Sequence, residues 1–90
     1  MHVLKSGAIW CNGCLVMKPR WNEIEKELPW LKTQYLDYDE DTTKVIDLGI
    51  KSDTLPTFIF FDKNNNILQT LTGEISKNEI LETIKKYENK

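Results

Sequence analysis

Cys11 and Cys14 are the only cysteines of this chain, and two residues separate them. With this spacing one thiol can attack a disulfide of another molecule, while the second thiol lies within reach to displace the bond that forms. The reaction would leave a Cys11–Cys14 disulfide, which some other reductant must restore to the dithiol. The pair therefore predicts thiol–disulfide exchange, a reaction that needs no bound cofactor.

The predicted local structure makes the two thiols unequal. A helical pattern begins at Cys11, where unpaired backbone N–H groups and the helix dipole favour a negatively charged sulfur. An ordinary thiol has a pKa near 8.5, so only about 3% of it is thiolate at pH 7; a pKa of about 7 makes about half of it reactive. Cys14 follows one turn later and is expected to be more enclosed. We therefore predict Cys11 as the nucleophile and Cys14 as the resolving thiol.

Other interpretations of the cysteine pair stay open at this point. A zinc site normally has four ligands, but this chain has no third cysteine and its one histidine is His2. Two packed, inert cysteines are a second possibility, although Trp10 before the pair and the helix start after it weigh against that. In a third, the pair holds a soft metal such as Cu(I), or docks a partner without turnover.

The bulk composition is that of one globular domain spanning residues 1–90. Hydrophobic residues make up 40% of the chain and charged residues 29%. The formal net charge of -2, without a basic stripe, argues against nucleic acid as a partner. No apolar run approaches the roughly 20 residues of a membrane helix, and the N-terminus has no secretory signal. We therefore expect a cytoplasmic monomer that does not bind membranes.

Apolar periodicity and turn residues predict the elements around the cysteines. The first helix starts at Cys11, kinks at Pro19 and ends before Pro29, and its apolar stripe has spacings of four, three and four: Met17, Trp21, Ile24 and Leu28. A capping box opens a final helix at Ser76. A short helix is expected to carry Val45 and Leu48. The predicted strands contain Val3 and Leu4, residues 34–38, residues 57–62 and residues 67–72.

This order, β-α-β-α-β-β-α, predicts an α/β fold. The first two strands are joined by a helix and should be parallel, whereas the last two form an antiparallel hairpin. The product is a four-stranded mixed sheet with helices on both faces.

Several of these features together resemble the thioredoxin family. Trp10-Cys11-x-x-Cys14 is similar to its active-site motif, and Pro19 lies where thioredoxins also carry a helix-kinking proline. Leu55-Pro56-Thr57 resembles the cis-proline loop of the family. The resemblance covers nearly the whole chain, and it implies a minimal thioredoxin-like fold and a protein-disulfide oxidoreductase.

The resemblance also implies a substrate-binding surface. Pro56 would be a cis proline beside Cys11, and Leu55 would offer backbone groups to an extended substrate peptide. Trp10, Leu55 and Gly73 would form a shallow, largely apolar docking surface. The implied partners are disulfide-containing proteins and a flavoprotein of the thioredoxin reductase type.

The chain departs from the thioredoxin pattern in three places. Its N-terminus is short, and Asn12-Gly13 stands between the cysteines where thioredoxins usually have Gly-Pro. Lys5 occupies the position of the family's buried acid, and Tyr35 aligns roughly with the lysine that pairs with that acid. We expect Lys5 to point to solvent, and Cys14 to be deprotonated through water or by Cys11.

Overall fold

A computed structural model describes all residues 1–90, and its core is one four-stranded sheet with the strand order β2-β1-β3-β4. Strand β1 pairs parallel with β2 and antiparallel with β3, and β3 pairs antiparallel with β4. The elements follow one another in the predicted order: β1 (His2–Gly7), α1 (Asn12–Glu27), β2 (Lys32–Asp37), α2 (Thr42–Asp47), a short 3-10 turn (Ser52–Thr54), β3 (Thr57–Phe61), β4 (Ile67–Thr72) and α3 (Lys77–Tyr87).

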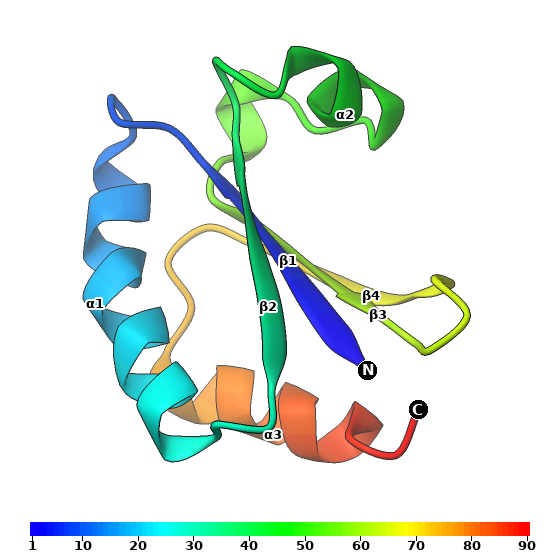
Figure 1. Ribbon diagram of the computed structural model, residues 1–90. Helices are drawn as coiled ribbons and strands as arrows, with labels where there is room; N and C mark the ends of the chain where they lie inside the picture. The colour runs from blue at the N-terminus through cyan, green and yellow to red at the C-terminus, as the bar shows by residue number, and fades with distance from the viewer.

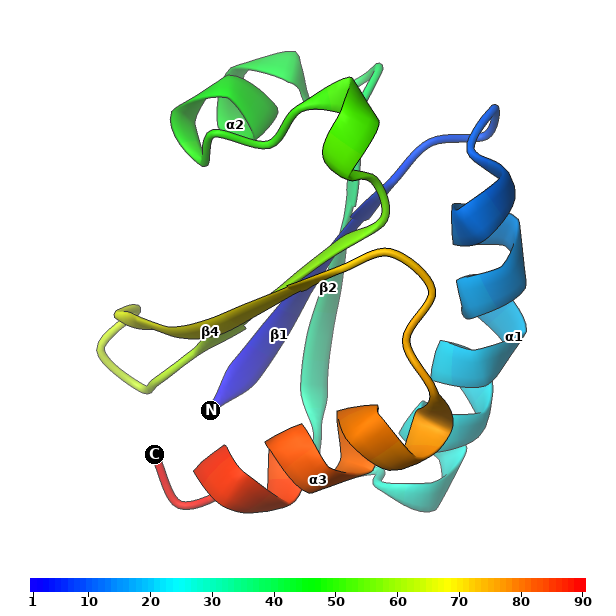
Figure 2. The ribbon, with the colours of Figure 1, turned by 180° about the vertical axis from the view of Figure 1, so that it is seen from behind.

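Two hydrophobic clusters place the helices on opposite faces of the sheet. In the first, side chains of α1 and α3 pack on the face of β1 and β3 that carries Val3, Phe58 and Phe60. In the second, Val45 of α2 packs with Leu4, Leu36, Ile50 and Ile59 on the other face. Figures 1 and 2 show α1 and α3 meeting near one end of the sheet, with α2 apart from them. The predicted mixed sheet with helices on both faces is confirmed.

The strand bounds differ from those predicted, and parallel pairing explains the difference. Strand β1 runs over six residues and β2 begins at Lys32, because their backbones pair in register from His2↔Lys32 to Gly7↔Asp37. Several of the paired residues are polar, so the apolar pattern gave no sign of them. The predicted stripe of α1 is confirmed, since Met17, Trp21 and Ile24 are all buried.

Two helix ends have the residues that commonly cap or stop a helix. The Ser76 hydroxyl accepts a hydrogen bond from the Glu79 N–H and caps α3. Gly49 has φ +70° after α2, the left-handed stop that glycine adopts at no steric cost. None of the helices is long and apolar enough to span a bilayer.

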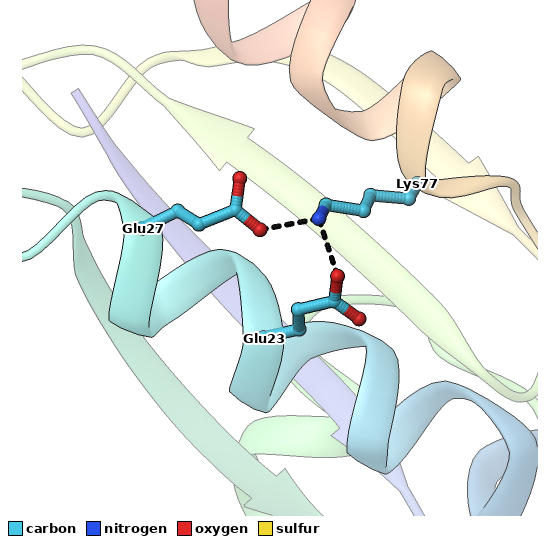
Figure 3. Close-up of polar contacts among 3 residues, drawn as sticks. All are labelled: Glu23, Glu27 and Lys77. Carbon is cyan, nitrogen blue, oxygen red and sulfur yellow. Dashed lines mark hydrogen bonds and ion pairs between the residues drawn. The ribbon is translucent and has the colours of Figure 1, made fainter.

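A cluster of three charged side chains ties α3 to α1. The Lys77 ammonium, at the start of α3, contacts the carboxylates of Glu23 and Glu27, which lie one turn apart on α1 (Figure 3). The hydrogen bond and charge of Lys77 lower the pKa of Glu23 below 4.5 and the two carboxylates raise the pKa of Lys77 above 10.5. All three groups face solvent, so salt should screen their attraction.

These shifts predict a pH-dependent effect of Lys77→Met. A carboxylate with a lowered folded-state pKa stabilises the fold above its ordinary pKa, and this contribution is lost as the pH falls through the lowered value. We therefore expect Lys77→Met to lower the free energy of unfolding near pH 7 and to lower it less at about pH 3. Urea unfolding at both pH values measures this; an equal loss at both would show that the charges are not responsible.

Candidate active site

Cys11 stands at the N-cap of α1, and a disulfide joins it to Cys14 across a Cα–Cα distance of 5.2 Å. Its Sγ accepts a hydrogen bond from the Cys14 N–H at 3.2 Å. The Cys11 carbonyl meanwhile accepts the N–H of Leu15, also at 3.2 Å, and so begins the helix. A thiolate at Cys11 would be stabilised by the Cys14 N–H and by the positive end of the helix dipole.

The expected difference in enclosure between the two cysteines is wrong for the disulfide form. Cys11 is buried, whereas Cys14 is half-buried. The reason is a pocket of about 360 Å³ between α1 and the ends of β1 and β2, which Cys14 lines. The distinct roles predicted for the two sulfurs therefore depend on the position of Cys11 at the helix start.

The loop before β3 lies directly against the segment between the cysteines. The Leu55–Pro56 peptide bond is cis, as the family resemblance implied. A Cβ placed on Gly13 would come within 3.1 Å of Pro56 Cδ, so only glycine fits there without displacement. The Gly73 N–H donates a hydrogen bond to the Pro56 carbonyl at 2.8 Å. The structure thus brings Pro56 and Gly73 beside the cysteine motif.

Leu55 and Trp10 lie in different places around the cysteine motif. The Leu55 side chain is half-buried against the cluster beneath α2, and its own N–H and carbonyl take part in no backbone hydrogen bond. Trp10 is half-exposed; its indole N–H donates to Asp39 at 2.7 Å and its ring packs edge-on against Tyr38. Leu55 therefore has free backbone groups, whereas Trp10 is held toward the loop after β2.

Lys5 does not point to solvent, so that expectation is wrong. Its ammonium pairs with the Glu25 carboxylate of α1 at 2.8 Å and lies 5.7 Å from the centre of the Trp21 ring. The Lys5 side chain is only 16% exposed. Glu25 also accepts a hydrogen bond from the Thr33 hydroxyl at 2.9 Å. Because Lys5 lies on the face of β1 that α1 covers, its largely buried charge is costly unless it is paired. Glu25 of α1 provides that pair.

Two neighbours of the cysteines were not predicted as site residues, although the family resemblance had aligned Tyr35 with a lysine that pairs with the buried acid of thioredoxins. The Tyr35 hydroxyl reaches the end of β1 at Gly7, next to Cys14, and Glu74 packs against Gly13. Both residues are remote from the motif in the chain, so neither was among the predicted site residues. The register of β1 with β2 places Tyr35 beside Lys5, in line with their alignment to a paired acid and lysine of the family.

A sheet of this order, a disulfide at the start of its first helix and a cis-proline loop beside it define the class of thioredoxin-fold proteins with a redox-active cysteine pair. Comparison with known proteins agrees. The protein-family model described as Thioredoxin matches residues 1–86. The chain therefore belongs to the thioredoxin family.

Individual relatives show how far this likeness extends. The chain is 35% identical over 80 residues to a thioredoxin of Rickettsia conorii, covering 88% of the chain and 73% of that protein. It is 34% identical over 83 residues to a chloroplastic M-type thioredoxin of Chlamydomonas reinhardtii, covering 91% of the chain but 57% of that protein. It is 32% identical over 81 residues to the pea M-type thioredoxin, covering 89% of the chain and 45% of that protein. The chain thus spans about half the length of these chloroplastic relatives.

Two solved structures show that the likeness extends to three dimensions. The thioredoxin NaTrxh of Nicotiana alata superposes with a TM-score of 0.84 at 25% identity, over 94% of this chain and 70% of that one. The thioredoxin of Trypanosoma brucei brucei, at 21% identity, superposes with a TM-score of 0.85 over 99% of this chain and 75% of that one, and shares the fold.

The ion pair beneath the site yields a stability prediction. Glu25→Gln leaves the Lys5 ammonium largely enclosed without its carboxylate, and should lower the free energy of unfolding by about 1–2 kcal/mol. Glu82→Gln, on the exposed face of α3, is the matched control and should have almost no effect. Urea unfolding of both variants measures the difference. Equal effects would contradict a stabilising Lys5–Glu25 pair.

Proposed function

We propose that this protein is a protein-disulfide oxidoreductase that reduces its substrates through a reversible Cys11–Cys14 disulfide. The observation that carries the proposal is the disulfide itself, formed between the N-cap cysteine of α1 and a cysteine one turn into the helix. Family membership supports it, because thiol–disulfide exchange is what the family resemblance implies. The roles of the two sulfurs follow from the helix start.

The reaction runs in two exchanges. The Cys11 thiolate attacks one sulfur of a substrate disulfide; a mixed disulfide forms and the other substrate sulfur leaves as a thiolate. Cys14 then loses its proton and attacks Cys11 Sγ, which releases the second substrate sulfur and forms the Cys11–Cys14 bond. The substrate gains two electrons from the cysteine pair. One proton leaves Cys14, and the two substrate thiolates take up protons from the solvent.

The surface around the cysteines suits an extended peptide chain as substrate. The free N–H and carbonyl of Leu55 supply a donor and an acceptor beside Pro56. Gly73 holds this loop through its bond to Pro56. Large exposed apolar side chains flank the cysteine motif on both sides in the sequence: Ile9, Trp10, Leu15 and Val16. We infer that the apolar surface binds the polypeptide around the disulfide being reduced.

The electron donor that fits best is a flavoprotein of the thioredoxin reductase type. Donation by glutathione is less favoured, because Asn12-Gly13 differs from the Pro-Tyr of glutaredoxins. We also propose a cytosolic location, since a dithiol that must be regenerated suits a reducing compartment.

Reduction of insulin disulfides by dithiothreitol tests the proposal. We expect the protein to accelerate this reduction, and Cys11→Ser to return the rate to that of dithiothreitol alone, because the nucleophile is lost. Cys14→Ser should also stop turnover, but it should trap a mixed disulfide between Cys11 and insulin that mass spectrometry detects.

Two outcomes would contradict the proposal. In the first, insulin reduction is no faster with the protein than without it, while the dithiol binds stoichiometric Cu(I); this result would favour a metal-binding module. A mixed disulfide found on Cys14 in the Cys11→Ser variant, with turnover retained, would reverse the roles of the two sulfurs.

A further inference from the structure

The sulfur of Cys14 and the hydroxyl of Tyr35 face one small space at the end of β1. A Cβ built on Gly7 would lie 3.0 Å from Cys14 Sγ and 3.2 Å from Tyr35 Oη. Because Gly7 carries no side chain, this point is not filled by a Cβ. A water placed there would lie within hydrogen-bonding range of both groups.

The surroundings leave this hydroxyl available to Cys14. Tyr35 Oη makes no hydrogen bond with any other group of the chain in the disulfide form, and both residues line the 360 Å³ pocket. Cys14 is half-buried there, so pocket water can take the proton of its thiol when the disulfide is open.

The charged side chains that line the pocket are either paired with other groups or exposed to solvent. Lys5 of β1 is paired with Glu25, and Asp37 of β2 accepts the N–H groups of Asp39 and Glu40. Lys18 of α1 is exposed, and β3 contributes only Phe58 after Pro56. None of these groups is hydrogen-bonded to Cys14. The Tyr35 hydroxyl, by contrast, shares the space at Gly7 with the Cys14 sulfur.

We propose that Tyr35 assists the second exchange by donating a hydrogen bond, directly or through one pocket water, to the sulfur of Cys14 as that thiol loses its proton. This inference rests on the proposed function. The proton of Cys14 goes to water in the pocket, and Tyr35 keeps its own. A hydrogen bond to the charged form of a group favours ionisation, so the thiolate that attacks Cys11 becomes more abundant at neutral pH.

The electrostatics of β2 keep Tyr35 in the donating form. Partial burial, and then the negative charges of Asp37, Asp39 and Asp41, raise the pKa of Tyr35 above 10.0. The phenol therefore stays protonated throughout the pH range in which a thiol of ordinary pKa ionises.

The two exchanges can be separated with dithiobis(nitrobenzoate), a small disulfide whose thiolate product absorbs visible light. Cys11 releases one thiolate on attack, and Cys14 releases the second when it resolves the mixed disulfide. We expect Tyr35→Phe to leave the first phase unchanged and to move the pH midpoint of the second phase upward by about one unit, a roughly tenfold slowing near pH 7.

Two further variants keep the test sharp. Tyr87→Phe, at the end of α3, removes a hydroxyl that donates a hydrogen bond to Gln69 of β4, and should leave both phases unchanged. Gly7→Ala fills the shared space with a methyl group while Tyr35 is retained, and should shift the second phase as Tyr35→Phe does. Stopped-flow traces across a pH series measure all three proteins against the parent.

The outcomes distinguish this inference from the function it rests on. If the second phase of Tyr35→Phe has the pH midpoint of the parent, or if both phases shift together, the role of Tyr35 is wrong while the oxidoreductase stands. If the parent itself shows no second phase and no insulin reduction, the proposed function fails first.

Discussion

The hydrogen bond from the Cys14 N–H to the Cys11 sulfur, at the first turn of α1, is the contact on which the account of this site depends. It places the sulfur among N–H groups that have no partner within the helix. In the disulfide form the Cys14 N–H is directed at a neutral sulfur, and in the dithiol form it would stabilise a thiolate. One backbone geometry thus serves both ends of the redox cycle, and it needs neither a metal nor a basic side chain.

The rest of the fold positions this turn. Strand β1 ends at Gly7, the chain crosses to Cys11 in a few residues, and the buried stripe of α1 holds the helix against β1 and β3 (Figure 1). From the other side, the loop before β3 packs Pro56 against Gly13. Beneath the helix, the Lys5–Glu25 pair joins β1 to α1. The cysteine motif is therefore held by a strand, a helix and a loop.

The sequence predicts what depends on local pattern and short spacing. The stripe of α1 and the cap at Ser76 each follow from side chains a few residues apart. Contacts between distant segments were missed or wrong where no family resemblance implied them, as it did for Pro56 beside the motif. Lys5 was expected in solvent because nothing near it in the chain indicated Glu25, and the approach of Tyr35 to Cys14 depends on the β1–β2 register. The enclosure of Cys14 was wrong because it depends on the pocket beside it.

The balance between the dithiol and the disulfide measures all of these interactions together, and its potential tests the central claim most directly. The Cys11–Cys14 couple should be equilibrated with glutathione buffers of known ratio, and its oxidised fraction measured. A reductase of protein disulfides should have a potential below the cytosolic glutathione pool, which lies at roughly -220 to -260 mV. A potential well above that range would contradict the account, because the pair would then oxidise its partners.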